Sequence, residues 1–204
     1  MINQIYQILI KSVTDLCYQT CLAHFSKNAS ILDVGIGNGI MIKKFHDLIK
    51  SKDLKITGID INQNYLKHCD SLIKKYALEK NIEIHCKPVE AYEPGTRGLF
   101  DFIFFSMSFM LFNDQSLVLK RLKDWIKPGG EIVFFQTMYT KRLRMMEAIK
   151  PNLKYVTGID FGSVTYEKDF FALLKDQGVL IKENRLLKRK WFQGEYRMIV
   201  TTLG

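Results

Sequence analysis

Three glycines at alternate positions lie between an apolar segment and an amphipathic one. They are Gly35, Gly37 and Gly39, and the apolar segment Ser30–Val34 precedes them. Glycine lacks a Cβ, so the backbone at these positions can pass close to a ligand. Asp60 ends the next apolar segment, 21 residues after Gly39, and a carboxylate there can accept hydrogen bonds from both hydroxyls of a ribose. The spacing therefore predicts a site for an adenosine-type ligand.

The carboxylate of Asp33 indicates which adenosine-type ligand fits. A dinucleotide site usually has the pattern G-x-G-x-x-G, and Ile40 occupies the place of its third glycine. Asp33 precedes the glycines and would repel a pyrophosphate bound at the following helix N-terminus. It would attract a cation instead. S-adenosylmethionine carries a sulfonium, an ammonium group and a ribose but no phosphate, so the charges favour it over NAD.

Apolar periodicity predicts strands that alternate with helices. Strands are expected at residues 30–34, 56–59, 82–86, 100–105, 131–135, 179–189 and 196–203. Helices are expected at residues 2–25, 40–49, from Asn62 or Asn64 to Tyr76, 114–126, 139–149, and 166–177 after a Thr165 cap. Residues 127–130 are expected to form a turn. Near-continuous apolar strands between amphipathic helices indicate an α/β fold, with a parallel sheet covered on both faces.

The connection between the final two predicted strands is short and contains Gly194. A parallel crossover needs a dozen or more residues, whereas a hairpin needs only a few. The seventh strand is therefore expected to run antiparallel to its neighbour.

The composition is that of one globular domain of 204 residues, 47% hydrophobic and 25% charged. It excludes a disordered chain and a disulfide-dense miniprotein. No apolar stretch approaches the roughly 18 residues of a membrane-spanning helix. Lys11 and Asp15 interrupt the first 25 residues, which do not resemble a signal peptide. We expect a cytoplasmic protein without a transmembrane segment.

Four segments together resemble the class I S-adenosylmethionine-dependent methyltransferases, and the similarity extends over residues 30–204. They are Leu32–Gly39, Gly58–Ile61, Phe100–Ile103 and Ile126–Gly130. The resemblance implies a Rossmann-like seven-stranded sheet with strand order 3-2-1-4-5-7-6. It also implies S-adenosyl-L-methionine as cofactor and S-adenosyl-L-homocysteine as product. Residues 1–29 would form a helical lid over the cofactor.

The same resemblance assigns cofactor contacts to individual residues. Asp33 and Gly35 to Gly39 would cradle the methionine part, Asp60 would hold the ribose and Ile61 would pack on the adenine. Family members often have an acid just after the third strand, where this chain has Pro88. Glu90 is the nearby substitute, and backbone carbonyls are the alternative. Ser106, at the end of the fourth strand, completes the set of candidate cofactor contacts.

The acceptor is expected over the ends of the fourth and fifth strands. Hydrogen bonds there could come from Ser106, Ser108, Gln136 and Tyr139. From the lid, Tyr6, Tyr18 and His24 could reach the site, and His24 is the candidate base. Structural roles for these residues are the alternative. The sequence does not identify a catalytic residue. No Asn-Pro-Pro-Tyr tetrapeptide follows the fourth strand, which weakens the case for a nucleic-acid amino group as substrate.

Two further patterns, a Cys/His helix face and a basic segment, are better explained by structure than by function. Cys17, Cys21 and His24 share one helix face, but buried sulfur side chains explain this better than a metal site, so we predict no metal. The segment Lys182–Lys190 holds five basic residues and one acidic residue in a chain of net charge +9. It could meet nucleic acid, an anionic protein or a membrane, whereas a solvated edge strand guarded by lysines is favoured.

The sequence therefore predicts a methyltransferase that acts on a small molecule at O, N or S. One alternative is a methyltransferase of protein or RNA that uses the basic C-terminal region. The other is a binding module with the methyltransferase fold and no catalytic activity. The sequence does not define the oligomeric state.

Overall fold

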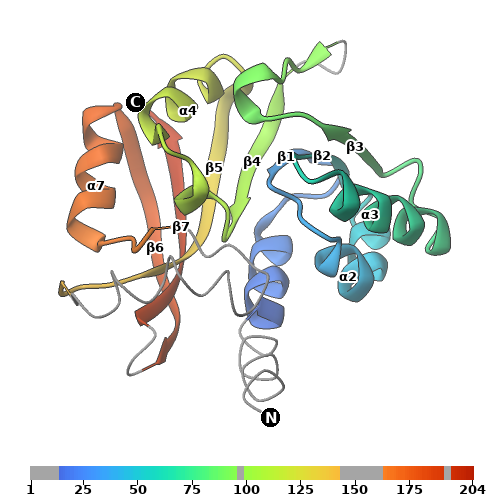
Figure 1. Cartoon of the computed structure of the whole chain (residues 1–204), viewed down its shortest axis with the longest axis horizontal. Helices are drawn as coiled ribbons and strands as arrows, with labels where there is room; N and C mark the ends of the chain where they lie inside the picture. The colour runs from blue at the N-terminus through green and yellow to red at the C-terminus, as the bar shows by residue number, and fades with distance from the viewer. Residues whose placement is uncertain (1–13, 96–98, 143–162, 191–193) are drawn as a thin grey trace.

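A computed structural model of the chain describes residues 14–95, 99–142, 163–190 and 194–204 (Figure 1). It contains a seven-stranded sheet of order β3-β2-β1-β4-β5-β7-β6. Strands β1 to β5 pair in parallel, and β7 is antiparallel to both β5 and β6. The predicted α/β fold, its strand order and the antiparallel seventh strand are confirmed.

The strands and helices follow the predicted alternation. The strands are β1 (Ser30–Val34), β2 (Lys55–Asp60), β3 (Ile82–Cys86), β4 (Phe100–Ser106), β5 (Ile126–Met138), β6 (Val179–Lys190) and β7 (Gly194–Leu203). The helices are α2 (Ile40–Ser51), α3 (Gln63–Lys75), α4 (Gln115–Leu122) and α7 (Glu167–Asp176), with the short 3-10 helices η1 (Val89–Ala91) and η3 (Phe109–Leu111). A further helix, called here the N-terminal helix, is described over residues 14–24. None of the helices within the described ranges is long and apolar enough to cross a bilayer.

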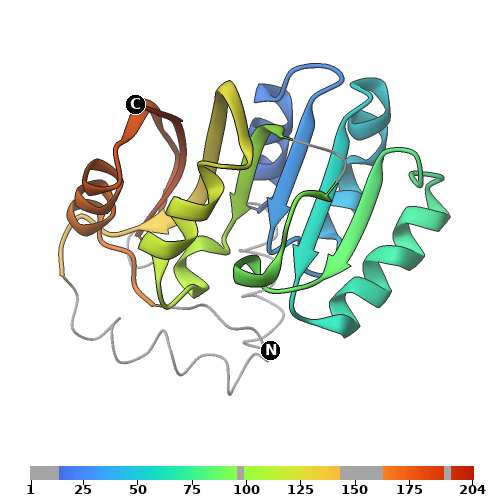
Figure 2. The same ribbon diagram turned by 90° about the horizontal axis from the view of Figure 1, so that it is seen from above.

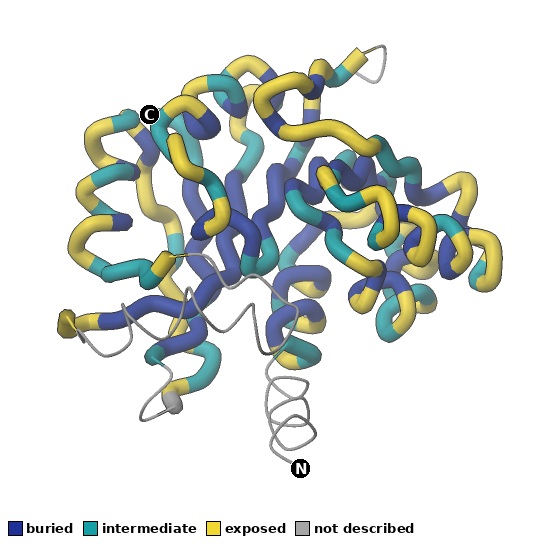
Figure 3. Tube along the Cα trace, in the orientation of Figure 1, coloured by how far each residue is buried: buried dark blue, intermediate teal, exposed yellow. Residues whose placement is uncertain are grey.

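Two hydrophobic layers cover the sheet, one on each face (Figures 1 and 2). The N-terminal helix, α2 and α3 pack on what we call the α2 face, and α4 and α7 pack on the α4 face. Side chains alternate between the faces along each strand, so Ile31 lies in the first layer and Leu32 in the second. The inner strands β1, β2 and β4 are the most continuously buried elements, whereas the edge strand β6 is largely exposed (Figure 3).

Side-chain caps explain where two helices begin. The Asn62 side chain accepts hydrogen bonds from the backbone N–H groups of Asn64 and Tyr65, so Asn62 rather than Asn64 caps α3. Asp114 caps α4 by accepting from the N–H of Leu117. The sequence therefore located both starts to within a residue.

The segment between α4 and β5 differs from the prediction. The helix ends at Leu122 instead of 126, and residues 127–130 belong to β5 instead of forming a turn. Phe100 of β4 donates its N–H to the carbonyl of Trp125, which starts the strand pairing early. The register then shifts between Phe100 and Phe102, where Gly129 adopts a φ of +78°. The extra residues form an irregularity in the strand.

The start of α7 also differs. Tyr166, not Thr165, is the N-cap residue, and its side chain makes no capping bond. The carbonyl of Thr165 instead accepts the N–H of Tyr139, as part of a short parallel bridge between residues 139 and 166. Residues 139–142 are not helical, and the rest of the helix predicted at 139–149 lies outside the described residues.

The C-terminal end of the N-terminal helix is attached to the core by one lysine. The Lys52 Nζ donates to the carbonyls of Leu22, Ala23 and Phe25, at 2.8, 2.8 and 2.5 Å. These carbonyls have no partner within the helix, and a cation at a helix C-terminus also interacts favourably with the helix dipole. Lys52 therefore holds the helix against the sheet.

Replacing Lys52 should loosen the N-terminal helix. We expect Lys52→Met, which keeps the alkyl chain, to lower the free energy of unfolding by about 1–3 kcal/mol because charged hydrogen bonds are lost. Urea denaturation measures this, and Lys67→Met on the exposed side of α3 is the matched control. Equal stabilities of the two variants would contradict the role given to Lys52.

Candidate active site

The glycine-rich loop between β1 and α2 combines close packing with one open position. Gly35, Gly37 and Gly39 have φ values of +83°, +66° and +77°, a region that side chains disfavour. A Cβ on Gly35 would lie 2.6 Å from the Ser108 Cβ, and one on Gly39 would lie 2.9 Å from the Leu72 Cδ1. A Cβ on Gly37 would meet only the Gly35 carbonyl, at 4.0 Å. The loop therefore presents its bare backbone to open space at Gly37.

Asp60 fastens this loop to the end of β2. Its Oδ2 accepts the N–H of Gly37 at 2.9 Å, and its Oδ1 accepts the N–H of Asn62 at 2.8 Å. The carbonyl of Ile59 accepts the N–H groups of Gly35 and Ile36. The residue predicted to hold the ribose thus also fixes the shape of the glycine loop.

Asp33 is a buried acid for which the described part of the chain supplies no counterion. Its side chain is 1% exposed, and its Oδ1 has no hydrogen-bond partner among the described residues. Burial, and secondly the charge of Asp60, raises the pKa of Asp33 to about 8. The carboxyl is therefore largely protonated at neutral pH, and a cationic ligand would favour its ionised form.

Tyr18 brings the N-terminal helix into this site. It is 9% exposed and forms a side-chain hydrogen bond with Ser106 at the carboxyl end of β4. Its ring packs edge-on against Phe104, with ring centroids 6.4 Å apart. Burial, and secondly the Asp33 charge, raises the pKa of Tyr18. Side chains from three separate elements therefore meet beside the glycine loop.

The turn after β4 packs against the glycine loop and the end of β1. The Ser108 hydroxyl donates to the carbonyl of Val34, and Met107 adopts a φ of +56°. Such a conformation is uncommon for a residue with a side chain. The order of the strands reverses between β1 and β4, which is where open α/β sheets bind ligands.

The residues expected near the adenine lie on the surface. Ile61 is 74% exposed directly after β2, and Glu90 is exposed on η1 after β3. An apolar side chain this exposed is available to pack on a flat ring. The structure leaves the assignment of adenine contacts to Ile61 and Glu90 as a prediction.

Two acceptor-side candidates are buried on β5 and just beyond it. Gln136 is 1% exposed, and neither its Nε2 nor its Oε1 has a hydrogen-bond partner. Gln136 shares its face of β5 with Phe134, on the α4 face, close to η3. Tyr139 is 5% exposed and joins β5 to the start of α7 through its backbone.

His24 is not placed with the other candidates. Its Nε2 lies 2.7 Å from the Glu131 Oε2, and its ring centroid lies 5.9 Å from that of Phe102. Both contacts are toward the amino ends of β4 and β5, whereas Tyr18 on the same helix contacts the carboxyl end of β4 at Ser106. The direction of the helix therefore places His24 away from Ser106 and the glycine loop. Its contacts do not support the predicted role as a base.

Sequence reasoning placed the glycines, Asp33 and Asp60 together, and the structure brings them together. It also named Tyr18 as a lid residue able to reach the site, and Tyr18 lies beside Ser106 on the same helix as the buried Cys17 and Cys21. Both cysteines lie in the hydrophobic layer of the α2 face. Among the described residues no group of three His, Cys, Asp or Glu side chains is arranged to hold a metal ion.

The strand order and the glycine loop beside its reversal are those of an α/β fold whose members bind nucleotide-type ligands. The family model described as a methyltransferase domain matches residues 31–130. Malonyl-[acyl-carrier protein] O-methyltransferase 2 of Ilyobacter polytropus is 26% identical over 162 residues, 76% of this chain and 59% of that one. Carboxy-S-adenosyl-L-methionine synthase of Shewanella pealeana is 22% identical over 136 residues, 67% of this chain and 54% of that one.

Among solved structures, an S-adenosylmethionine-dependent methyltransferase from Aquifex aeolicus is similar in fold. Its TM-score is 0.68 at 18% identity, and the match covers 92% of this chain and 89% of that one. In its sequence over residues 31–130 and in its fold, the chain is similar to the class I S-adenosylmethionine-dependent methyltransferases. It spans somewhat more than half the length of the two curated relatives described above.

Cofactor affinity should depend on pH through Asp33. Below pH 8 the carboxyl must lose a proton before it can pair with a cation, so binding releases a proton. We expect affinity for S-adenosylmethionine to rise with pH, by up to about tenfold per unit, and to level off above pH 8. Calorimetry in buffers of different ionisation enthalpy measures both quantities. Asp33→Asn should bind more weakly with a flatter profile, and an unchanged profile would contradict the assignment.

Asp60 should contribute to cofactor binding both directly and through the loop. We expect Asp60→Ala to weaken binding of S-adenosylhomocysteine by about 1–3 kcal/mol, because charged hydrogen bonds are lost. Calorimetry at one pH measures the effect. Asp70→Asn on α3 is the control, since Asp70 pairs only with the neighbouring Lys74 in the described structure. Unchanged affinity of Asp60→Ala would place the ribose elsewhere.

Proposed function

We propose that the protein transfers a methyl group from S-adenosylmethionine to a small-molecule acceptor at O, N or S. The observation that carries this proposal is the buried Asp33 carboxyl with an oxygen that lacks a partner, next to open space above Gly37. A ligand that is cationic and lacks phosphate satisfies both features. The match of residues 31–130 to the methyltransferase domain family supports the same cofactor.

In this proposal the cofactor's methionine part lies along the glycine loop, near Asp33. The ribose pairs with Asp60, and Ile61 packs on the adenine. When bound, S-adenosylmethionine supplies an electrophilic methyl group on a sulfonium. Tyr18 and Ser106 then cover the methionine part and exclude water.

In-line displacement requires alignment and shielding more than acid–base chemistry. This requirement agrees with a site made of positioning side chains. Tyr18, on the N-terminal helix, contacts Phe104 and Ser106 of β4. These contacts fix the orientation of its ring in the absence of a ligand. Residues 1–29 act as the lid in this proposal, with Tyr18 as its contact to the site.

The acceptor is proposed to lie over the ends of β4 and β5. Gln136 offers one donor group and one acceptor oxygen without partners, and Phe109 and Met110 of η3 form a buried apolar surface nearby. A small molecule with an apolar body and a carboxyl, amide or hydroxyl group would match. Two of the described relatives carry names for distinct reactions, a malonyl-carrier O-methylation and a carboxy-S-adenosylmethionine synthesis.

The second name supports one alternative, in which the cofactor itself is modified. Mass spectrometry of the cofactor after incubation with pooled small molecules tests both. Release of S-adenosylhomocysteine together with a product heavier by one methylene supports methyl transfer. A modified cofactor supports the alternative, and failure to bind S-adenosylmethionine or S-adenosylhomocysteine would leave only a non-catalytic module.

Gln136→Leu should separate acceptor binding from folding. Removing two buried polar atoms without partners should raise the free energy of unfolding by about 1–2 kcal/mol. The KM for the acceptor should rise about tenfold, because a buried hydrogen bond to it is lost. Affinity for S-adenosylhomocysteine should not change. A destabilised variant with an unchanged KM would show that Gln136 is structural.

A further inference from the structure

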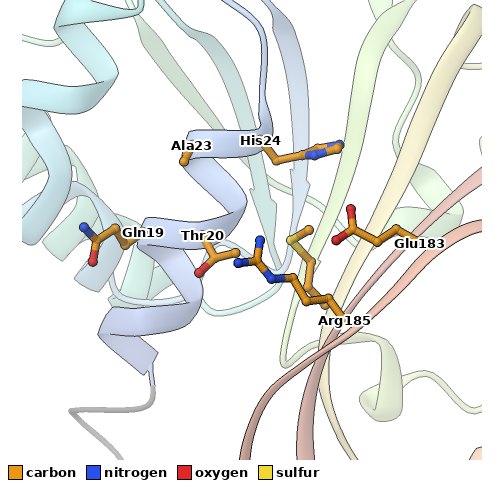
Figure 4. A pocket seen from close by; sticks show the side chains of 7 residues that line it. Gln19, Thr20, Ala23, His24, Glu183 and Arg185 are labelled. Carbon is orange, nitrogen blue, oxygen red and sulfur yellow. The ribbon is translucent and has the colours of Figure 1, made fainter.

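A second groove lies on the α2 face, between the N-terminal helix and strands β6 and β7 (Figure 4). Its volume is about 390 Å³. Its lining residues are Gln19, Thr20, Ala23, His24, Glu183, Arg185 and Met198. The glycine loop contributes no residue to it, so this groove is separate from the candidate active site.

The helical wall of the groove is held in place on two sides. Lys52 binds the carbonyls at the end of the helix, as described above. His24 contacts Glu131, and Glu131 also pairs with Lys182 of β6 at 2.5 Å. The carboxylate of Glu131 therefore links the N-terminal helix to the edge strand β6. These contacts hold the walls of the groove in place without a bound partner.

Arg185 and Glu183 are the charged side chains of this groove for which no ion pair or side-chain hydrogen bond is found within the described ranges. Arg185 shares a face with Met198, its pairing partner on β7, and Figure 4 shows its side chain reaching toward Thr20. The other described arginines all have carboxylate partners: Arg121 with Glu93, Arg142 with Asp169, and Arg189 and Arg197 with Glu195.

The two faces of β6 differ in their uncompensated charge. Lys188 pairs in register with Tyr196, on the α2 face, and its charge lowers the pKa of Cys17 on the N-terminal helix against the larger raising effect of burial. Arg189 is neutralised by Glu195. On the groove side, the positive charges of Arg185 and Lys188 therefore exceed the single negative charge of Glu183, which lines the same groove.

We propose that this groove docks an acidic segment of a partner protein, with Arg185 binding one of its carboxylates. A guanidinium binds a carboxylate through two parallel hydrogen bonds. Ala23 and Met198 offer an apolar floor, and Gln19 and Thr20 can bond to a peptide backbone. The net charge of +9 opposes a second copy of this chain as the occupant.

The arrangement of charges favours a peptide over nucleic acid. Arg185 and Lys188 lie about 10 Å apart along the strand, judged from the rise per residue. Glu183 and Glu131 lie among them, which matches separated carboxylates better than a continuous row of phosphates. The described lining contains no Trp, Tyr or Phe on which a base could stack.

The test uses a short fluorescein-labelled peptide with Glu at every third position between Ala and Leu residues. Fluorescence anisotropy measures its binding to the full chain, and a peptide with Gln in place of Glu is the probe control. We expect Arg185→Gln to weaken binding about fivefold to tenfold, and Lys188→Gln to weaken it less. Arg189→Gln, on the opposite face of the same strand, should have no effect.

Amide chemical shifts locate the bound peptide. Perturbations at Gln19, Thr20 and Arg185 are expected, and binding should weaken with salt. Urea denaturation checks that the variants fold. Equal binding by wild-type protein and Arg185→Gln would overturn the proposal, as would equal losses in the Arg185 and Arg189 variants. Tighter binding of oligouridylate or of phosphatidylglycerol vesicles than of the acidic peptide would also overturn it.

Discussion

The buried carboxyl of Asp33 is the constraint on which the site depends. It lies in the sheet at the end of β1, with one oxygen that has no partner and no cation beside it. An isolated charge in such a place is far less stable than the protonated acid. The ligand-free protein therefore holds a neutral acid, and a cationic ligand restores the charge. The sequence analysis expected a charged Asp33 to repel a pyrophosphate. With a neutral Asp33, the preference for a cationic ligand arises because such a ligand favours ionisation of the carboxyl.

The rest of the site is arranged around that acid. Asp60 raises the pKa of Asp33 and also fixes Gly37, so one carboxylate both shapes the loop and tunes its neighbour. Tyr18 covers the α2 face of the site, while Gln136 lies on the α4 face. The alternation of side chains along the parallel strands places these two residues on opposite faces of the sheet.

Local patterns predicted most of the fold. Apolar periodicity located all seven strands, and Asn62 marked the start of α3. The errors occurred where contacts between distant residues decide the secondary structure. The N–H of Phe100 bonds to the carbonyl of Trp125, and residues 127–130 belong to β5 instead of a turn. The glycines, Asp33 and Asp60 could be grouped from spacing alone. His24 could not be placed, because its position depends on the direction in which the helix crosses the sheet. The unpaired atoms of Gln136 likewise result from neighbours that are far away in the sequence.

The order of the sheet has a consequence for biosynthesis. Strand β6 precedes β7 in the chain, yet β7 lies inside the sheet and β6 at its edge. When β6 leaves the ribosome it has no neighbour with which to pair, because the adjoining position is filled by a strand made later. Until the hairpin adds as a unit, the edge of β5 remains open to pairing with other nascent chains. A chaperone that shields this edge would act in the interval between synthesis of the two strands.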